Sequence, residues 1–223
     1  NAPSGNGPDR LSTMLSGIDD VYEFADESDS YPQRVTLNRN TVAGGIGRPH
    51  PLMQAQNGRA IVHIPDHPHE GECVIPEDLE EMFLLDGEER REWPLEIDGD
   101  NPVSPEVVAM SDSMGGPLEF PFKPAPAQRE FIAIAAYDGH RAGVGRVVTD
   151  ATWHHFLDIN IDGTGHVQTQ DGEPRTGLQD SDGNDRPELV RLRQHWRNLA
   201  EWLMPPEGRR RCAAVIHIED ALP

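Results

Sequence analysis

The sequence predicts an α/β domain, because strand-like and helix-like segments alternate along it. Two apolar, β-branched segments at 131–139 and 145–152 are typical of paired strands, and the HRAGVG between them carries turn-forming glycines. Residues 187–204 carry leucine and tryptophan at spacings of three and four, as an amphipathic helix does. These are the strongest structural signals in the chain.

The chain divides into two parts by composition. Residues 1–44 are polar and rich in Gly, Ser, Asp and Asn, so we expect an N-terminal arm that carries at most one short strand. Residues 45–223 are expected to form the α/β domain, or the C-terminal part of a larger one. The first residue is Asn rather than Met, so we expect a processed chain or a fragment.

The other elements follow from local patterns. A compact apolar run predicts a strand at 59–64. Pro76, the acidic residues after it and an apolar spacing of three and four predict a helix over 76–85. Two further short strands are predicted at 105–112 and 212–220.

Charge excludes two classes of partner. The 223 residues carry a formal charge of −20, from 39 acidic and 19 basic residues. Nucleic acid and anionic membrane surfaces would be repelled. No apolar run reaches the roughly 18 residues of a membrane span, and no signal peptide is visible. We therefore expect a soluble protein, cytoplasmic rather than secreted, with secretion as the alternative.

The two cysteines do not form a disulfide scaffold. Cys73 and Cys212 could pair, bind a metal or be unrelated thiols. Val74 and Ile75 follow Cys73 where a nucleophile elbow would need a glycine. Cys73 is therefore expected to be a structural or an incidental thiol.

A histidine-rich loop follows the predicted strand at 59–64. Within IPDHPHEGEC, the side chains of Asp66, His67, His69 and Glu70 are candidate binding groups. Open α/β sheets place their sites just past the carboxyl ends of strands. The alternative is that these histidines only hydrogen-bond to the backbone.

A second group of candidates lies in the predicted hairpin. His140 and Arg141 occupy its turn and are candidate binding residues. His154 and His155 directly follow its second strand, where adjacent side chains point to opposite faces. One of these two, the candidate catalytic residues, could act as a general base beside a nearby aspartate. The alternative is again a structural histidine.

Two metal hypotheses arise from these segments. His67, His69 and His155 could bind zinc or another divalent metal, although their spacing matches no strong zinc motif, and no cofactor is otherwise expected. The stretch DINIDGTGHVQT begins like a calcium loop at Asp158, but its twelfth residue is Thr169 instead of a bidentate glutamate. We expect no tight calcium binding there.

Several phrases resemble one known family. HPLMQAQNGRAIVHIPDHPHEGEC, GRVVTDATWHHFLDINI and RQHWRNLAEWLMPP are similar to phrases of the class I glutamine amidotransferase-like superfamily, near its ThuA-like (trehalose-utilisation) members. The resemblance covers about residues 49–205. It implies a flavodoxin-like three-layer sandwich with a mostly parallel sheet, and a site at His154 and His155.

The resemblance leads to three functional hypotheses. The first is a non-classical amidotransferase-like domain without a nucleophile elbow, acting as a binding or assembly module or as a hydrolase of unknown substrate. The second is a metal-dependent hydrolase that uses the histidine-rich loops. The third is a structural subunit of a larger assembly.

A protein partner is expected from the same fold. The polar start of the chain lacks the apolar opening strands of such a sheet, and only two helices are predicted to cover it. The strands at 59–64 and 131–136 alternate little, so both of their faces should be buried. Another chain or an upstream segment would then complete the sheet. We also predict that the loop carrying His69 approaches His155.

Overall fold

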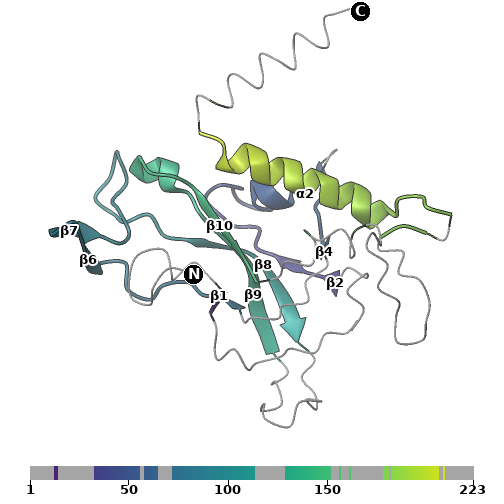
Figure 1. The fold of residues 1–223 in the computed structure, drawn as a ribbon, viewed down its shortest axis with the longest axis horizontal. Coiled ribbons are helices and arrows are strands. Elements are labelled where there is room, and N and C mark those ends of the chain that lie inside the picture. The colour runs from purple at the N-terminus through teal and green to yellow at the C-terminus, as the bar shows by residue number, and fades with distance from the viewer. Residues whose placement is uncertain are drawn as a thin grey trace, which may run out of the picture.

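The fold was obtained as a computed structural model (Figure 1). It describes residues 13–14, 33–55, 58–64, 72–113, 129–151, 156, 161, 178–180, 182–205 and 208. The central element is an antiparallel sheet, and one long helix, α2, lies beside it.

The central sheet has six strands and is built around β9 (Arg129–Tyr137). β8 (Glu106–Ser113) pairs along one side of β9, while β5 (Glu72–Cys73) and β10 (Val147–Asp150) pair with it at other positions. Two short strands, β1 (Thr13–Met14) and β3 (Thr36–Leu37), complete the order β1-β5-β9-β8-β3. Every pairing in this sheet is antiparallel.

The prediction of a flavodoxin-like sandwich with a mostly parallel sheet is wrong. Parallel neighbours need long crossover connections, usually helices, on the faces of the sheet. Here β9 is joined to β10 by a short turn and pairs with β8 antiparallel. β9 is apolar along its length because it lies in the centre of an antiparallel sheet and its side chains are buried on both faces.

The predicted hairpin at 131–152 is confirmed. Val147 pairs with Tyr137, and Asp150 pairs with Ile134. The turn contains the short helix η4 (Gly139–Ala142). A Cβ atom added at Gly139 would lie 1.9 Å from a backbone carbonyl oxygen, so this turn requires glycine there.

The predicted helix at 76–85 is wrong. Its second half is β6 (Met82–Leu85), which forms a separate two-stranded sheet with β7 (Glu88–Arg91). Asp86 and Gly87 make the connection with φ angles of 54° and 82°. An Asp-Gly pair with two positive φ angles is the preferred two-residue hairpin turn, and it overrides the helical spacing of the apolar residues.

Of the other predicted strands, one is confirmed in full and one only at its end. The strand predicted at 105–112 is confirmed as β8. The segment 59–64 becomes a strand only at β4 (His63–Ile64), which pairs antiparallel with β2 (Gln33–Arg34). β2 and β3 both come from the segment that we expected to be an arm. The strand predicted at 212–220 lies outside the described residues.

The predicted C-terminal helix is confirmed as α2 (Pro187–Leu203). Proline at its first position suits a helix start, because the missing N–H would have no partner there. Met204 is already extended, as is usual for a residue before proline. The residues that α2 buries are Leu189, Leu192, His195 and Trp202.

The main core lies between α2 and the sheet. α2 packs against the short helix η2 (Pro51–Met53) and against β4, and both contribute to the core with β8 and β9. Five consecutive residues of β9, 133–137, are buried, in agreement with the expectation of burial on both faces of that strand. A second, smaller cluster joins Trp93, Val103 and Tyr137. No described helix is long and apolar enough to cross a membrane.

Candidate functional site

Most of the residues predicted for a site lie outside the described residues. This holds for the loop with Asp66, His67, His69 and Glu70 and for the pair at 154–155. It also holds for the calcium-like loop at 158–169, apart from Ile161. Their predicted approach and the proposed metal ligands therefore stay predictions. Among the residues that the structure describes, no group of three His, Cys, Asp or Glu side chains is placed to hold a metal ion.

The other two predicted binding residues are in η4. The guanidinium of Arg141 forms an ion pair with Glu96. The backbone carbonyl of Arg141 accepts a hydrogen bond of 2.8 Å from Ile97 N. Arg141 thus holds the loop at 94–103 against the β9–β10 turn, and His140 lies beside it, half-buried.

Cys73 is buried in β5. Its thiol donates to the carbonyl oxygen of Ala133, with 3.5 Å between sulfur and oxygen. A cysteine buried among apolar side chains packs as a small hydrophobic residue. This environment fits a structural thiol.

A buried polar cluster joins η2, the β9–β10 turn and the end of α2. Burial lowers the pKa of His50 to about 4; the charge of Asp138 raises it and that of Arg146 lowers it further, and both effects are smaller than that of burial. Nδ1 of His50 accepts a hydrogen bond from Leu52 N at 3.3 Å, so the neutral ring carries its proton on Nε2. Nε2 is buried as well. The side chains of His50, Asp138 and Arg146 are buried or nearly so, and their contacts join η2, the turn and α2.

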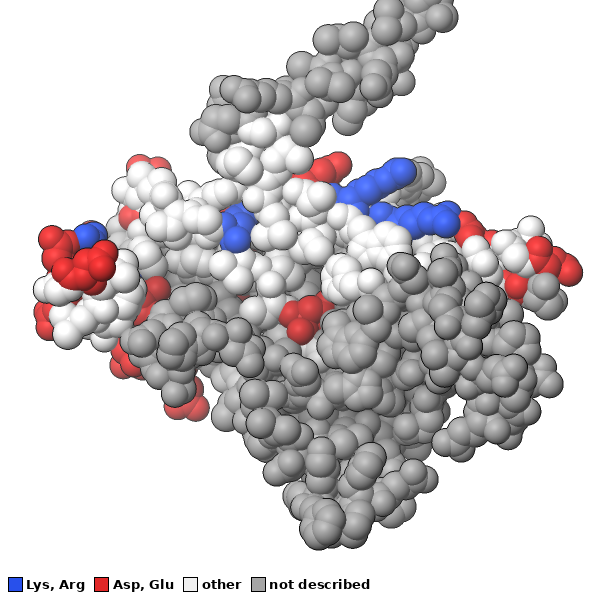
Figure 2. Space-filling view, in the orientation of Figure 1, with Lys and Arg blue, Asp and Glu red and all other residues white. Residues whose placement is uncertain are grey.

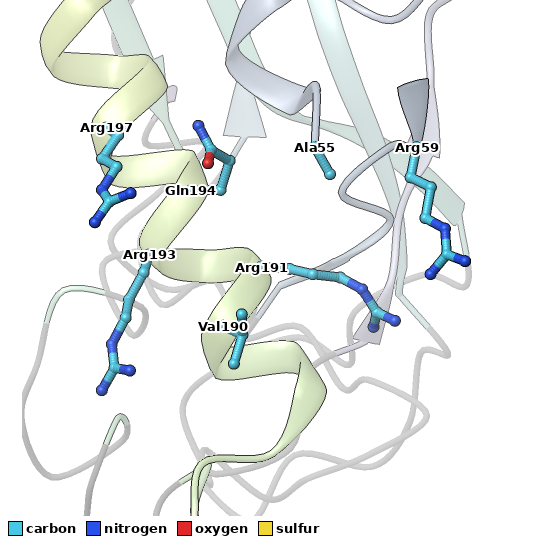
Figure 3. A pocket seen from close by; sticks show the side chains of 7 residues that line it. All are labelled: Ala55, Arg59, Val190, Arg191, Arg193, Gln194 and Arg197. Atoms are coloured by element: carbon cyan, nitrogen blue, oxygen red, sulfur yellow. The ribbon is translucent and has the colours of Figure 1, made fainter. Parts of the chain in front are cut away.

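An open pocket lies on α2. Its volume is about 300 Å³, at the lower end of the range for small-molecule sites. It is lined by Ala55, Arg59, Val190, Arg191, Arg193, Gln194 and Arg197 (Figure 3). Four arginines thus line one pocket in a chain whose net charge is −20.

The helix geometry explains three of these arginines. At 3.6 residues per turn, positions 190, 194 and 197 share the middle of one helical face, and Arg191 and Arg193 flank it on either side. This face is opposite to the buried one. Figure 2 shows Lys and Arg side chains gathered over the N-terminal half of α2.

The fourth arginine is held by the chain that follows η2. The Ala55 N–H donates to the Arg59 carbonyl at 2.8 Å, and Gln54 and Ala60 form an isolated antiparallel β-bridge. These two pairings define a turn between residues 54 and 60. Asn198 fastens this turn to α2, because its Nδ2 donates to the carbonyls of Leu52 at 3.1 Å and Gln54 at 2.7 Å. The two walls of the pocket are therefore joined by hydrogen bonds.

The pocket keeps a local positive charge. Arg191 pairs with Glu188 at 3.2 Å, and Arg193 pairs with Asp185. Arg59 and Arg197 have no carboxylate partner among the described residues. Arg193 and Arg197 are also four residues apart on one helix, where like charges repel. The arrangement suits a bound anion, which would relieve that repulsion.

The sequence contained a signal for this pocket that the prediction did not use. The stretch RLRQHWR places Arg191, Arg193 and Arg197 within seven residues of an otherwise acidic chain. The prediction of a helix over 187–204 depends only on its apolar residues. The contribution of Arg59 had no local signal, because it depends on a contact between segments more than 130 residues apart.

Comparisons with family models, with curated proteins and with solved structures found no match. The resemblance to amidotransferase-like proteins stays untested by them. The parallel sheet that it implies is not the sheet observed.

Proposed function

We propose that this protein is a binding module for a small anion, which it holds in the arginine-lined pocket between α2 and the turn at 54–60. The observation that carries the proposal is the gathering of four arginines from two chain segments in a protein of net charge −20. The planar guanidinium of arginine donates two parallel hydrogen bonds to a carboxylate or phosphate. Lysine, with a single ammonium group, lacks that geometry.

Binding fits the pocket better than catalysis does. A general acid or base and a nucleophile are the groups that a hydrolytic site needs. The described lining offers arginine, glutamine and two small apolar side chains, none of which suits those roles near neutral pH. The lining can orient and neutralise an anion without transforming it.

The test is thermal unfolding of the whole chain with sulfate or citrate, against sodium chloride at matched ionic strength. A ligand at one hundred times its Kd stabilises the folded state by about 2.7 kcal/mol. We expect at least one of these anions to raise Tm by several degrees beyond the chloride control. Equal Tm values in all three salts would contradict the proposal.

Substitutions then locate the site. Arg59→Gln and Arg197→Gln should each reduce the rise in Tm, because each removes a guanidinium that has no carboxylate partner among the described residues. Arg90→Gln is the matched control, since Arg90 is an exposed arginine of β7 that pairs with Glu88 away from the pocket. An unchanged anion effect in both pocket variants would place the binding elsewhere.

A further inference from the structure

We propose that the hairpin of β6 and β7 is a docking site for a partner protein, which adds an extended segment of alternating basic and apolar residues along the edge of β6. This proposal goes beyond the anion pocket, because none of the hairpin residues lines that pocket. Three observations carry it: the open edge of the two-stranded sheet, the exposed apolar side chains of β6 and the acidic charge around them.

The hairpin is held firmly at its base. Leu79, just before β6, and Trp93, just after β7, pack in the smaller apolar cluster with Tyr137 of β9. Glu92 N donates to the Glu81 carbonyl at 3.0 Å, which continues the pairing of the two strands toward this base. From there β6 and β7 lie at one end of the long axis of the molecule (Figure 1). The base therefore fixes the surface that the two strands present.

The edge of β6 is suited to strand addition. The sheet of β6 and β7 has no third strand among the described residues, and an edge of this kind is a template for pairing with another chain. Charged side chains commonly protect such edges. All four residues of β7, EERR, are charged, whereas β6, MFLL, has no charged residue. Addition of a strand to such an edge is a recurring mode of peptide recognition.

The apolar side chains of β6 supply surface for a partner to cover. Met82 is 47% exposed, Leu84 70% and Leu85 52%. Single exposed apolar residues are common on protein surfaces, but here three lie in one strand of four residues. Alternation along the strand places Met82 and Leu84 on the same face. An added strand with apolar side chains on that face would remove this surface from water.

The charge of the hairpin selects a basic partner. Residues 77–92 contain eight acidic and two basic residues. Both arginines already form ion pairs with glutamates of the same segment. Glu89, which lies opposite Leu84 in the strand register, has no basic partner among the described residues. Figure 2 shows Asp and Glu side chains gathered at this end of the molecule. Lysine or arginine in the added strand would meet complementary charge.

The same charge argues against other occupants. Two copies of this chain paired along β6 would bring two acidic hairpins together, on molecules that each carry a net charge of −20. Like charges placed together in an interface are costly. Nucleic acid and anionic membrane surfaces meet the same repulsion. A basic, extended segment of another protein satisfies both the open edge and the charge.

The experiment is isothermal titration of the full chain with a peptide of about eight residues in which lysine and valine alternate. Two control peptides separate the parts of the proposal. In one, glutamate replaces lysine. In the other, the side chains are kept and the backbone amides are N-methylated, so the peptide cannot donate hydrogen bonds to a strand edge. We expect the lysine–valine peptide to bind at least about tenfold more tightly than either control.

Substitutions then locate the site. Leu84→Thr removes exposed apolar surface and keeps a residue that suits a strand, so affinity for the lysine–valine peptide should fall about tenfold or more. Glu89→Gln should weaken binding about threefold at low ionic strength. Ile46→Thr is the matched control, because Ile46 is 94% exposed in the loop before η2, outside the hairpin, and its loss should leave the affinity unchanged. Far-ultraviolet circular dichroism checks the folding of each variant.

Several results would overturn the proposal. Equal binding of the lysine and glutamate peptides would exclude a basic partner, and equal binding of the N-methylated peptide would exclude strand addition. No binding of the lysine–valine peptide, or equal effects of Leu84→Thr and Ile46→Thr, would exclude this site. Sedimentation of the chain alone tests the second copy. A dimer that Leu84→Thr dissociates would replace the proposal by self-association, whereas we expect the same sedimentation coefficient for both proteins.

Discussion

The ring of His50 contacts the indole of Trp202 edge to face, with 4.5 Å between the ring centroids. Arg146 lies over the same indole, its guanidinium carbon 3.6 Å from the ring centroid. Its Nη1 donates to the Trp202 carbonyl at 2.9 Å. The last turn of α2 contains no basic residue, so Arg146 supplies from the β9–β10 turn the positive charge that a helix C-terminus favours.

Removal of Arg146 should therefore destabilise the whole domain. Arg146 also forms a two-point ion pair with Asp138, at 2.6 and 3.3 Å, and both side chains are largely buried. Arg146→Gln leaves the aspartate without its charge partner, so we expect a loss of about 3 kcal/mol in the free energy of unfolding. Urea denaturation measures this loss. The exposed pair of Arg90 and Glu88 is the control, and Arg90→Gln should change stability by less than about 0.5 kcal/mol.

Acidification should destabilise the protein through His50. The unfolded chain binds this proton with a pKa near 6.5, whereas the folded state binds it only near pH 4. The contribution of neutral His50 to the free energy of unfolding is therefore fully present above pH 6.5. It is lost as the pH drops from 6.5 to 4, which lowers the free energy of unfolding by about 3 kcal/mol.

The variant His50→Asn isolates this effect. Asparagine can accept the hydrogen bond from Leu52 N at the start of η2, but it does not titrate. The unfolding free energy of the variant should fall less steeply between pH 6.5 and 4 than that of the unmodified protein. Parallel pH profiles for the two proteins would contradict the assignment of this proton to His50.

Asn198→Ala should weaken both the fold and the pocket. The substitution removes two hydrogen bonds from α2 to the carbonyls of Leu52 and Gln54, which costs about 2 kcal/mol in unfolding free energy. It also frees the turn that carries Arg59, so anion affinity should fall. Arg90→Gln, at an exposed position of β7 away from the pocket, should leave anion affinity unchanged and alter stability by less than about 0.5 kcal/mol.

Tyr137→Phe should be neutral or stabilising, by up to about 1 kcal/mol. The Tyr137 hydroxyl is buried and has no hydrogen-bond partner among the described residues, and burial raises its pKa. The ring packs edge to face on Trp93 at 5.5 Å between centroids, and phenylalanine keeps that contact. Thermal unfolding distinguishes the outcomes. A loss above 1 kcal/mol would mean that the hydroxyl is bonded, and Tyr137→Leu should destabilise in either case.

Elements with a strong local pattern were predictable. The leucines and tryptophans of α2 repeat at helical spacing and the helix begins with Pro187, so its bounds agree with the prediction within one residue. The hairpin of β9 and β10 needed only apolar strands and a glycine turn. The helix predicted over 76–85 failed because Asp86 and Gly87 reverse the chain directly after it.

Strand direction was not predictable from the same patterns. An apolar run such as 131–136 indicates burial on both faces, and both parallel and central antiparallel strands satisfy that condition. The choice depends on how the connections run, and here a short turn at Gly139 brings β10 back beside β9. The described strands of this sheet pair antiparallel, so the expectation of missing opening strands of a parallel sheet no longer applies, and a protein partner stays a prediction.

By itself, the sequence determined the acidic charge, the helix, the main hairpin and β8, because these depend on composition and on neighbours a few residues apart. Only the tertiary structure decided the antiparallel order of the sheet and the arginine pocket. Arg59 and Arg197 line the same pocket because α2 packs on η2 and is hydrogen-bonded there through Asn198. Contacts between segments that distant have no signature in local periodicity, since the burial that drives them is non-directional.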